Sequence, residues 1–154
     1  MFADFFPSIL QNKIMWISLS AWILAQAAKL VINFLVEKKW DFSLLISSGG
    51  FPSSHTAIVS ALALSVGKVE GWDSSVFAIA VVLAVIVMYD AAGVRRAAGN
   101  HARVINYMVE WLRQFNADRS AFNLQEERLK ELIGHTPFEV FGGAILGGLI
   151  GLIF

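Results

Sequence analysis

The sequence predicts an all-α membrane protein, a helical bundle of about four transmembrane helices with amphipathic cytoplasmic helices attached. Hydrophobic residues make up 56% of the 154 residues and charged residues only 16%, whereas charged residues are about 25% of an ordinary soluble domain. The mean hydropathy is +0.63, and the apolar residues gather in four runs. At this length, the whole chain, 1–154, is expected to form a single membrane domain.

The first apolar run, 14–36, is long enough to cross a bilayer. Its 23 residues, at about 1.5 Å each, exceed the ~30 Å of a hydrocarbon core. A cleavable signal peptide is the alternative, because Lys13 precedes the run and residues 25–27, Ala-Gln-Ala, resemble a cleavage site. The run continues past that site to Val36, which favours a retained helix.

Three more apolar runs are expected to be spans. The run 56–67 is short and would need its polar flanks buried against protein. The run 76–88 continues through Gly93, and the run 138–154 ends the sequence. Together with the first run, these segments predict four membrane helices.

The segment 94–135 is predicted to be a cytoplasmic helical loop inserted between the third and fourth spans. Apolar residues recur in it at helical spacing and are opposed by polar residues, which is typical of an amphipathic helix. The apolar members are Val104, Ile105, Met108, Val109, Leu112 and Phe115. A second short helix is predicted from Asn123, with Glu126 completing a capping box.

The distribution of Lys and Arg predicts the orientation. If all four runs cross, the loops 37–55 and 94–135 share one side. They carry Lys38, Lys39, Arg95, Arg96, Arg103, Arg113, Arg119, Arg128 and Lys130, whereas the other side carries only Lys13 and Lys68. The positive-inside rule therefore places both loops in the cytoplasm, and we expect an integral protein of a bacterial-type plasma membrane with its polar motifs on the cytoplasmic side.

Composition also excludes several classes of function. The net charge is zero, so no nucleic-acid partner is expected. The sequence has no cysteine, which excludes disulfides, thiol chemistry and cysteine-ligated zinc.

Polar side chains interrupt the first span. Gln26, Lys29 and Asn33 fall at i, i+3 and i+7, and therefore on one stripe of a helix. Such groups normally face a protein interior or a water-filled cavity. Alternatively, the aliphatic part of the Lys29 side chain lies along the helix and its ammonium group reaches the cytoplasmic interface.

A polar stretch, GGFPSSHTA, leads into the second run at residues 49–57. Ser53 or Ser54 can cap the helix that follows, but capping does not account for Gly50 or His55. Free N–H groups at a helix start attract anions. A histidine beside them can donate a proton to a leaving oxygen near neutral pH.

The third span ends in MYDAAGVRRAAGN, residues 88–100. Arg95 and Arg96 are either flanking cytoplasmic charges or groups that bind phosphate oxygens in a bidentate manner. Asp90, near the membrane boundary, can orient one of them.

The last motif is GHTPFEVFGGAILGGLIG, residues 134–151. Thr136, Pro137 and Glu139 predict a helix start with a capping box. Glu139 can instead accept a hydrogen bond from one nitrogen of His135, which would leave the other nitrogen nucleophilic. A glycine ridge, predicted to pack closely against another span, consists of Gly143, Gly147 and Gly151.

These residues resemble the type 2 phosphatidic acid phosphatases, relatives of the vanadium haloperoxidases. PSSH is similar to their PSGH motif, and GHTPFEVFGGAILG is similar to the end of their third motif, where His is followed four residues later by Asp. The wider pattern resembles the small divergent branch of that superfamily, from about Trp22 to Gly151.

The sequence departs from the family pattern at four places. The first motif, a Lys followed by Arg-Pro, is missing, and Lys29 or the pair 38–39 is a partial substitute. Ser54 replaces a glycine, Glu139 replaces the Asp, and Leu129 stands where the third motif has Arg. Arg95 or Arg96 can supply that charge. Arg95 and His101 have the family spacing, but Ile105 follows where the acid belongs, so His135 is preferred over His101.

The resemblance implies a metal-independent, cofactor-free phosphatase or pyrophosphatase acting on a lipid. His135 would form a phosphohistidine while Glu139 holds its other nitrogen, and His55 would protonate the leaving oxygen. The phosphoryl charge would be stabilised by Arg95, Arg96, Lys29 and the backbone amides of Ser53 and Ser54. Gly50 would also bind the substrate, and Asp90 would orient an arginine. The expected partners are a lipid phosphate, membrane lipids and a second copy paired through the glycine-rich last helix.

Two other functions remain open at this stage. The departures from the family motifs also suit an inactive membrane assembly factor that binds lipid or phosphate. A small transport subunit, with Gln26, Lys29 and Asn33 lining a path, is the second alternative.

Overall fold

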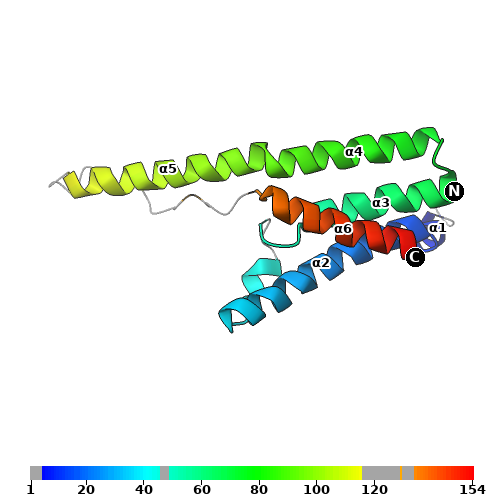
Figure 1. The fold of residues 1–154 in the computed structure, drawn as a ribbon, viewed down its shortest axis with the longest axis horizontal. Helices are drawn as coiled ribbons and strands as arrows, with labels where there is room; N and C mark the ends of the chain where they lie inside the picture. The colour runs from blue at the N-terminus through cyan, green and yellow to red at the C-terminus, as the bar shows by residue number, and fades with distance from the viewer. Residues whose placement is uncertain (1–4, 46–48, 116–128, 130–133) are drawn as a thin grey trace.

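A computed structural model describes residues 5–45, 49–115, 129 and 134–154, with the side chains of residue 5 and residues 113–115 left out. All regular elements in these ranges are helical (Figure 1). They are α1 (Phe5–Leu10), α2 (Lys13–Glu37), the short 3-10 helix η1 (Phe42–Leu45), α3 (Ser54–Glu70), α4 (Ser75–Ala92), α5 (Val94–Phe115) and α6 (Pro137–Ile153). The predicted all-α fold is therefore confirmed for the described residues.

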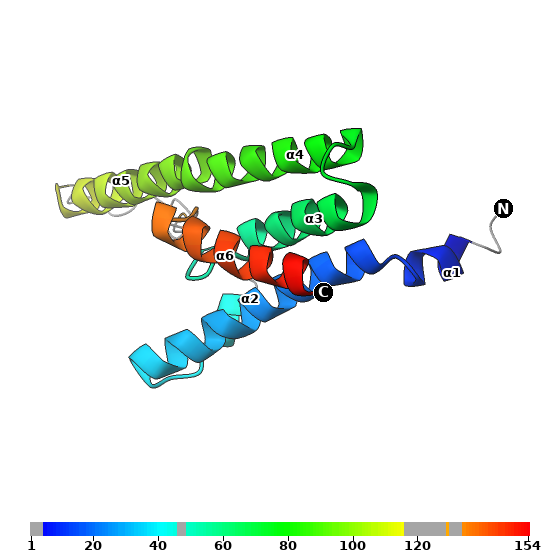
Figure 2. The same ribbon diagram turned by 45° about the vertical axis from the view of Figure 1, so that its right-hand side comes forward.

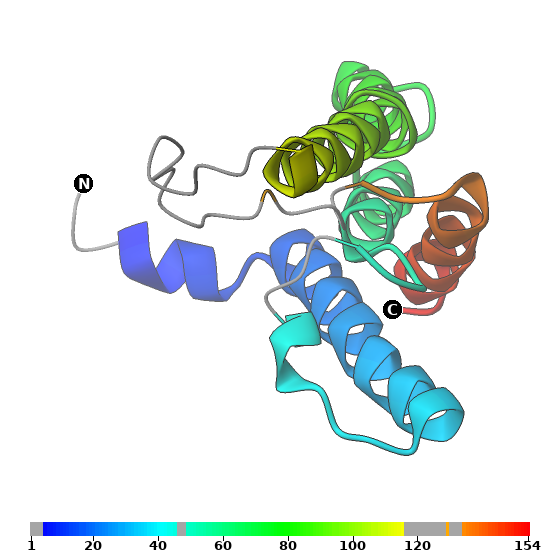
Figure 3. The ribbon, with the colours of Figure 1, turned by 90° about the vertical axis from the view of Figure 1, so that its left-hand side faces the viewer.

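Helix α3 is the centre of the bundle. It packs against α2, α4 and α6, whereas α5 packs against α4 alone among the described elements (Figure 3). The side of α3 that meets its neighbours is built from small residues, such as Ala57 and Ala61, which are fully buried. Small side chains let helix backbones approach closely where no aqueous hydrophobic effect drives association.

The glycine ridge of α6 faces α3. A Cβ at Gly143 would overlap the Ser53 carbonyl oxygen, one at Gly147 the Ala57 carbonyl, and one at Gly151 would crowd the Ala61 carbonyl. Both series advance by four residues, so α3 and α6 run parallel with their backbones in contact. The predicted close approach to another helix is confirmed. Pairing of two copies stays a prediction, and it would have to use another face of α6.

Two candidate membrane spans meet the requirements of length and apolarity among the described residues. They are α2, with 25 residues, and the 38-residue stretch Ser75–Leu112, which joins α4 to most of α5. Helix α6 is apolar but shorter. Helices α3 and α6 have 17 residues each, or about 26 Å. Helices thus lie where the four runs predicted them, and the crossing of the bilayer by α3 and α6 stays a prediction.

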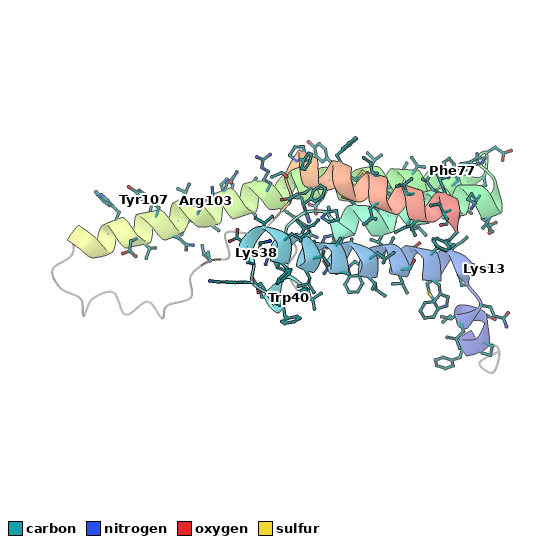
Figure 4. The ribbon with its side chains drawn as sticks, turned by 60° about the horizontal axis from the view of Figure 1, so that its bottom comes forward. Lys13, Lys38, Trp40, Phe77, Arg103 and Tyr107 are labelled. Carbon is teal, nitrogen blue, oxygen red and sulfur yellow. The ribbon has the colours of Figure 1, made fainter. Side chains whose placement is uncertain are left out.

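The polar motifs gather at one end of the bundle. The end of α2, the start of α3, the end of α4 and the start of α6 lie there, while the turn between α3 and α4 lies at the opposite end (Figures 1 and 2). After α2, the chain folds back through Lys38, which has a positive φ of 56°, and Trp40 stacks on Phe34. Figure 4 labels Lys38 and Trp40 at this turn.

The segment 94–135 contains the predicted amphipathic helix as α5. It projects beyond the bundle and continues roughly the direction of α4 (Figures 1 and 2). The second helix, predicted from Asn123, lies outside the described residues.

Candidate active site

Two histidines meet at the polar end of the bundle. His55 lies in the first turn of α3, and His135 lies directly before Thr136, the cap of α6. Because α3 and α6 start at the same end and run parallel, their first turns are adjacent. The two imidazole rings have centroids 5.8 Å apart and meet edge to face at 76°.

His135 is positioned through its backbone. Its N–H donates a hydrogen bond of 2.9 Å to the Ala91 carbonyl near the end of α4. Gly134 has a φ of +94°, and a Cβ there would overlap the backbone of Arg95 and Arg96. Only glycine combines that conformation with so close a contact. The sequence analysis missed these two supports, although the glycine before His135 was a visible signal for one of them.

The His135 side chain is 1% exposed, and neither imidazole nitrogen has a hydrogen-bond partner among the described residues. Burial, together with the positive charges of Lys29, His55 and Arg95, lowers the pKa of His135 to about 4. The imidazole is therefore neutral at pH 7 and carries an uncommitted lone pair. A nucleophile that attacks phosphorus needs both properties.

His55 is held in a similar electrostatic environment. Burial is the largest cause that lowers the pKa of His55. The charges of Arg95 and Lys29 lower this pKa further, and the charge of Asp90 raises it. A doubly charged phosphoryl group placed beside His55 would favour the protonated form.

Lys29 points into the protein. Its side chain is 3% exposed, its Nζ donates to Ser54 Oγ at 3.4 Å, and its stem lies beside Gly50. The alternative in which Lys29 extends to the interface is therefore wrong. The other two residues of the polar stripe form hydrogen bonds to the segment that follows α2. Gln26 Nε2 donates to the Leu45 carbonyl at 2.7 Å, and Asn33 Nδ2 donates to the Lys39 carbonyl at 3.2 Å.

Ser53 caps α3, as the sequence predicted. Its hydroxyl accepts hydrogen bonds from the Thr56 N–H at 3.3 Å and from the Thr56 hydroxyl at 3.0 Å. Its own N–H, however, donates to the Glu139 carbonyl at 2.9 Å. The expectation that the Ser53 amide binds substrate is corrected accordingly, because this donor is used to join the starts of α3 and α6. Ser54 contributes the hydroxyl that meets Lys29.

The two arginines are not equivalent. Arg95 Nε lies 2.6 Å from Asp90 Oδ2, and both side chains are partly exposed, so Asp90 orients an arginine as predicted. The charge of Arg95 acts on both histidines. The Arg96 side chain is exposed, and its described role is the packing of its backbone against Gly134. Arg95 is thus the arginine that pairs with Asp90 and whose charge lowers the pKa of both histidines.

Glu139 takes the role that its capping-box spacing predicts. Its Oε2 accepts the Thr136 N–H at 3.0 Å, and its N–H donates to Thr136 Oγ1 at 3.3 Å. The hydrogen bond to His135 that the family resemblance implies is not formed, because Glu139, at the third position of α6, turns back over the helix start. Its carboxylate remains close enough to Lys29 for electrostatic attraction.

His101 lies apart from this cluster. It is exposed on α5, which packs only on α4 among the described elements, whereas His135 touches His55. Within the described ranges, no group of three His, Asp or Glu side chains is arranged to hold a metal ion. The arrangement is one of two imidazoles with lowered pKa values beside the cations Lys29 and Arg95, which suits an anionic ligand and nucleophilic or acid–base chemistry.

Comparison with known proteins identifies a family and a relative that cover most of the chain. The model of the "Divergent PAP2 family" matches residues 10–150. The uncharacterized membrane protein YuiD of Bacillus subtilis (strain 168) is 45% identical over 150 residues, which cover 94% of this chain and 95% of the relative. No solved structure matches the chain. Both matches extend over the segments that carry His55 and His135.

Proposed function

Because the chain belongs to the divergent PAP2 family, we propose that it is a membrane-embedded lipid phosphate or pyrophosphate phosphatase. It works without a metal ion, through a phosphohistidine. One observation carries the proposal. A buried, neutral His135 imidazole, which has no hydrogen-bond partner in the described part of the chain, lies against His55 and within the field of Lys29 and Arg95.

The proposed reaction has two steps. An imidazole nitrogen of His135 attacks the phosphorus of the bound lipid, and the bond from phosphorus to the leaving oxygen breaks as the new N–P bond forms. His55, protonated in the presence of the phosphoryl anion, gives its proton to that leaving oxygen. A water molecule then attacks the phosphohistidine, transfers its proton to His55 and releases phosphate, which restores the neutral His135.

The cations stabilise the charge on the phosphoryl oxygens. The Lys29 ammonium is buried and fixed by Ser54, and the Arg95 guanidinium is fixed by Asp90. Preorganised charges of this kind are usually the largest catalytic contribution, because they need not reorient as the transition state forms. Gly50 lies beside the Lys29 stem, where a Cβ would make only an ordinary contact, and its φ of +92° is a conformation that favours glycine.

The surroundings favour a lipid as substrate. The site lies at one end of a bundle whose outward side chains are large and apolar, among them Phe138 and Phe141 of α6. A lipid tail can remain in the bilayer while its head group enters the polar end. In this proposal all four helices α2, α3, α4 and α6 cross, and the excess of Lys and Arg places the site in the cytoplasm.

The test is phosphate release from prenyl diphosphate and phosphatidate substrates by the purified chain. His135→Ala should abolish release, whereas His101→Ala, on the exposed side of α5, should leave it unchanged. Full activity of His135→Ala would overturn the proposal. Tight phosphate or vanadate binding without turnover would instead support an assembly factor. Substrate flux into proteoliposomes that does not depend on His135 would support a transport subunit.

A further inference from the structure

Helix α5 has an exposed apolar face that its own bundle does not cover. Val104, Ile105, Met108 and Leu112 are between 40% and 56% exposed, and α4 is the only described element in contact with α5. At 100° per residue, these four residues occupy an arc of about 100°, and Arg103 and Glu110 lie on the opposite side of the helix. An amphipathic helix of this kind needs an apolar environment along one side.

We propose that α5 docks on the anionic cytoplasmic surface of the membrane, with this apolar face in the boundary between head groups and acyl chains. The charge of the helix matches that partner. Over residues 94–112, α5 carries Arg96 and Arg103 against the single acid Glu110, in addition to Arg95, whose charge is paired with Asp90. Basic residues beside an apolar face are attracted to anionic lipids.

The edges of the apolar face also suit a lipid surface. Trp111 and Tyr107 lie at one edge and are 50% and 72% exposed, and aromatic side chains of this amphipathic type are enriched at membrane interfaces. Figure 4 labels Arg103 and Tyr107 on the part of α5 that lies beyond the bundle. A second copy of the chain would more commonly be bound through a narrow stripe of two positions per heptad, whereas this face is wide.

The position of α5 in the chain brings it to that surface. It follows α4 with only Gly93 between them, and the two helices together make up the 38-residue candidate span Ser75–Leu112. In the structure, α5 continues the direction of α4 (Figure 1), so docking requires a bend. Gly93 is where the chain leaves helical geometry, with φ −102° and ψ −87°, and a glycine between two helices is a common site of such bends.

The absence of cysteine from the sequence allows a direct test in the full chain. Met108→Cys on the apolar face and Arg103→Cys on the polar face would each carry a nitroxide in proteoliposomes containing phosphatidylglycerol. The label at 108 should be accessible to oxygen and shielded from a water-soluble nickel complex, and the label at 103 should show the reverse. In the Met108→Cys background, Arg103→Gln should lower the ratio of docked to undocked helix about fivefold in these vesicles and leave it unchanged in phosphatidylcholine.

Two results would overturn this inference. In the first, both labels are equally accessible to the nickel complex, as expected for a helix that projects into water. In the second, the label at 108 shows spin–spin broadening that disappears on dilution with unlabelled protein, which would identify a second copy as the occupant. Neither result bears on phosphate release, so docking and the proposed catalysis fail or succeed separately.

Discussion

Helices α6 and α5 carry the two kinds of apolar surface in this chain, and the structure uses them differently. Helix α6 places Gly143, Gly147 and Gly151 directly on the backbone of α3, which fixes the first turns of both helices and therefore the distance between His55 and His135. Helix α5 continues α4 beyond the bundle and meets no other described helix; its other described contacts are Gly134 against the backbone of Arg95 and Arg96 and the hydrogen bonds between Asn106 and Leu129. Backbone contact thus determines the site geometry, whereas the apolar face of α5 has no such contact with another described helix.

The largest effect is expected from removing the charge of Lys29, which is buried inside the helix bundle rather than on α5. Lys29→Met should lower turnover about 10²- to 10³-fold, because a fixed charge beside the phosphoryl group is lost. Lys68→Met is the matched control, since Lys68 donates to the Leu152 carbonyl near the ends of α3 and α6 that lie away from the site, and it should leave turnover unchanged. Steady-state phosphate release measures both. Equal losses in the two variants would mean that the lysines act through the fold alone.

The second prediction concerns pH. The folded protein keeps His135 neutral down to about pH 4, whereas the unfolded chain takes up the proton near pH 6.5. Lowering the pH from about 6.5 to about 4 should therefore favour unfolding, by on the order of 3 kcal/mol from this residue, and the trend should end below pH 4. Unfolding in detergent, followed by circular dichroism, should show a smaller pH dependence in His135→Asn. An identical dependence would contradict the burial of a neutral imidazole.

A smaller effect tests the backbone contact itself. Gly147→Ala places a methyl group against the Ala57 carbonyl and should lower the free energy of unfolding by about 2 kcal/mol. At Gly148, the added Cβ would lie 3.4 Å from the Leu64 side chain, an ordinary contact. Gly148→Ala should therefore be neutral or stabilising by up to about 1 kcal/mol. If the two variants melt alike, α3 and α6 are not packed through the ridge.

The smallest effect is expected at Glu139. Glu139→Gln keeps a capping box, because glutamine can also accept the Thr136 N–H, so we expect less than about 1 kcal/mol of destabilisation. Turnover should fall by less than tenfold, since Glu139 does not contact His135 in the structure. A loss near 10²-fold with an unchanged melting temperature would show that Glu139 does hold the imidazole during the reaction.

Much of the fold followed from local sequence patterns. The caps Ser53 and Thr136, the ridge of glycines and the apolar runs each depend on residues close together in the chain, and the structure contains all of them. The four membrane crossings that the apolar runs predicted are a different case. Helices α3 and α6 have only 17 residues each, and apolar content alone does not distinguish a membrane span from a helix packed inside a protein.

The sequence predicted that several of the candidate residues would lie at one end of the bundle, but it did not predict their individual contacts. Glu139 had two partners compatible with the same spacing, and only the fold shows that it caps α6. The Ser53 N–H is used by a carbonyl on a helix distant in sequence, which no local pattern reveals. Arg95 and Arg96 are neighbours in sequence but about 100° apart on a helix, so selecting between them required the position of Gly134 and of both histidines.

The most direct measurement is capture of the covalent intermediate. The chain would be mixed with a lipid diphosphate labelled on its terminal phosphorus, quenched in alkali, and tested for protein-bound label that is stable in base and lost in acid. The account predicts labelling of the wild-type chain and of His101→Ala, and none of His135→Ala. A base-stable label of undiminished intensity on His135→Ala would contradict it.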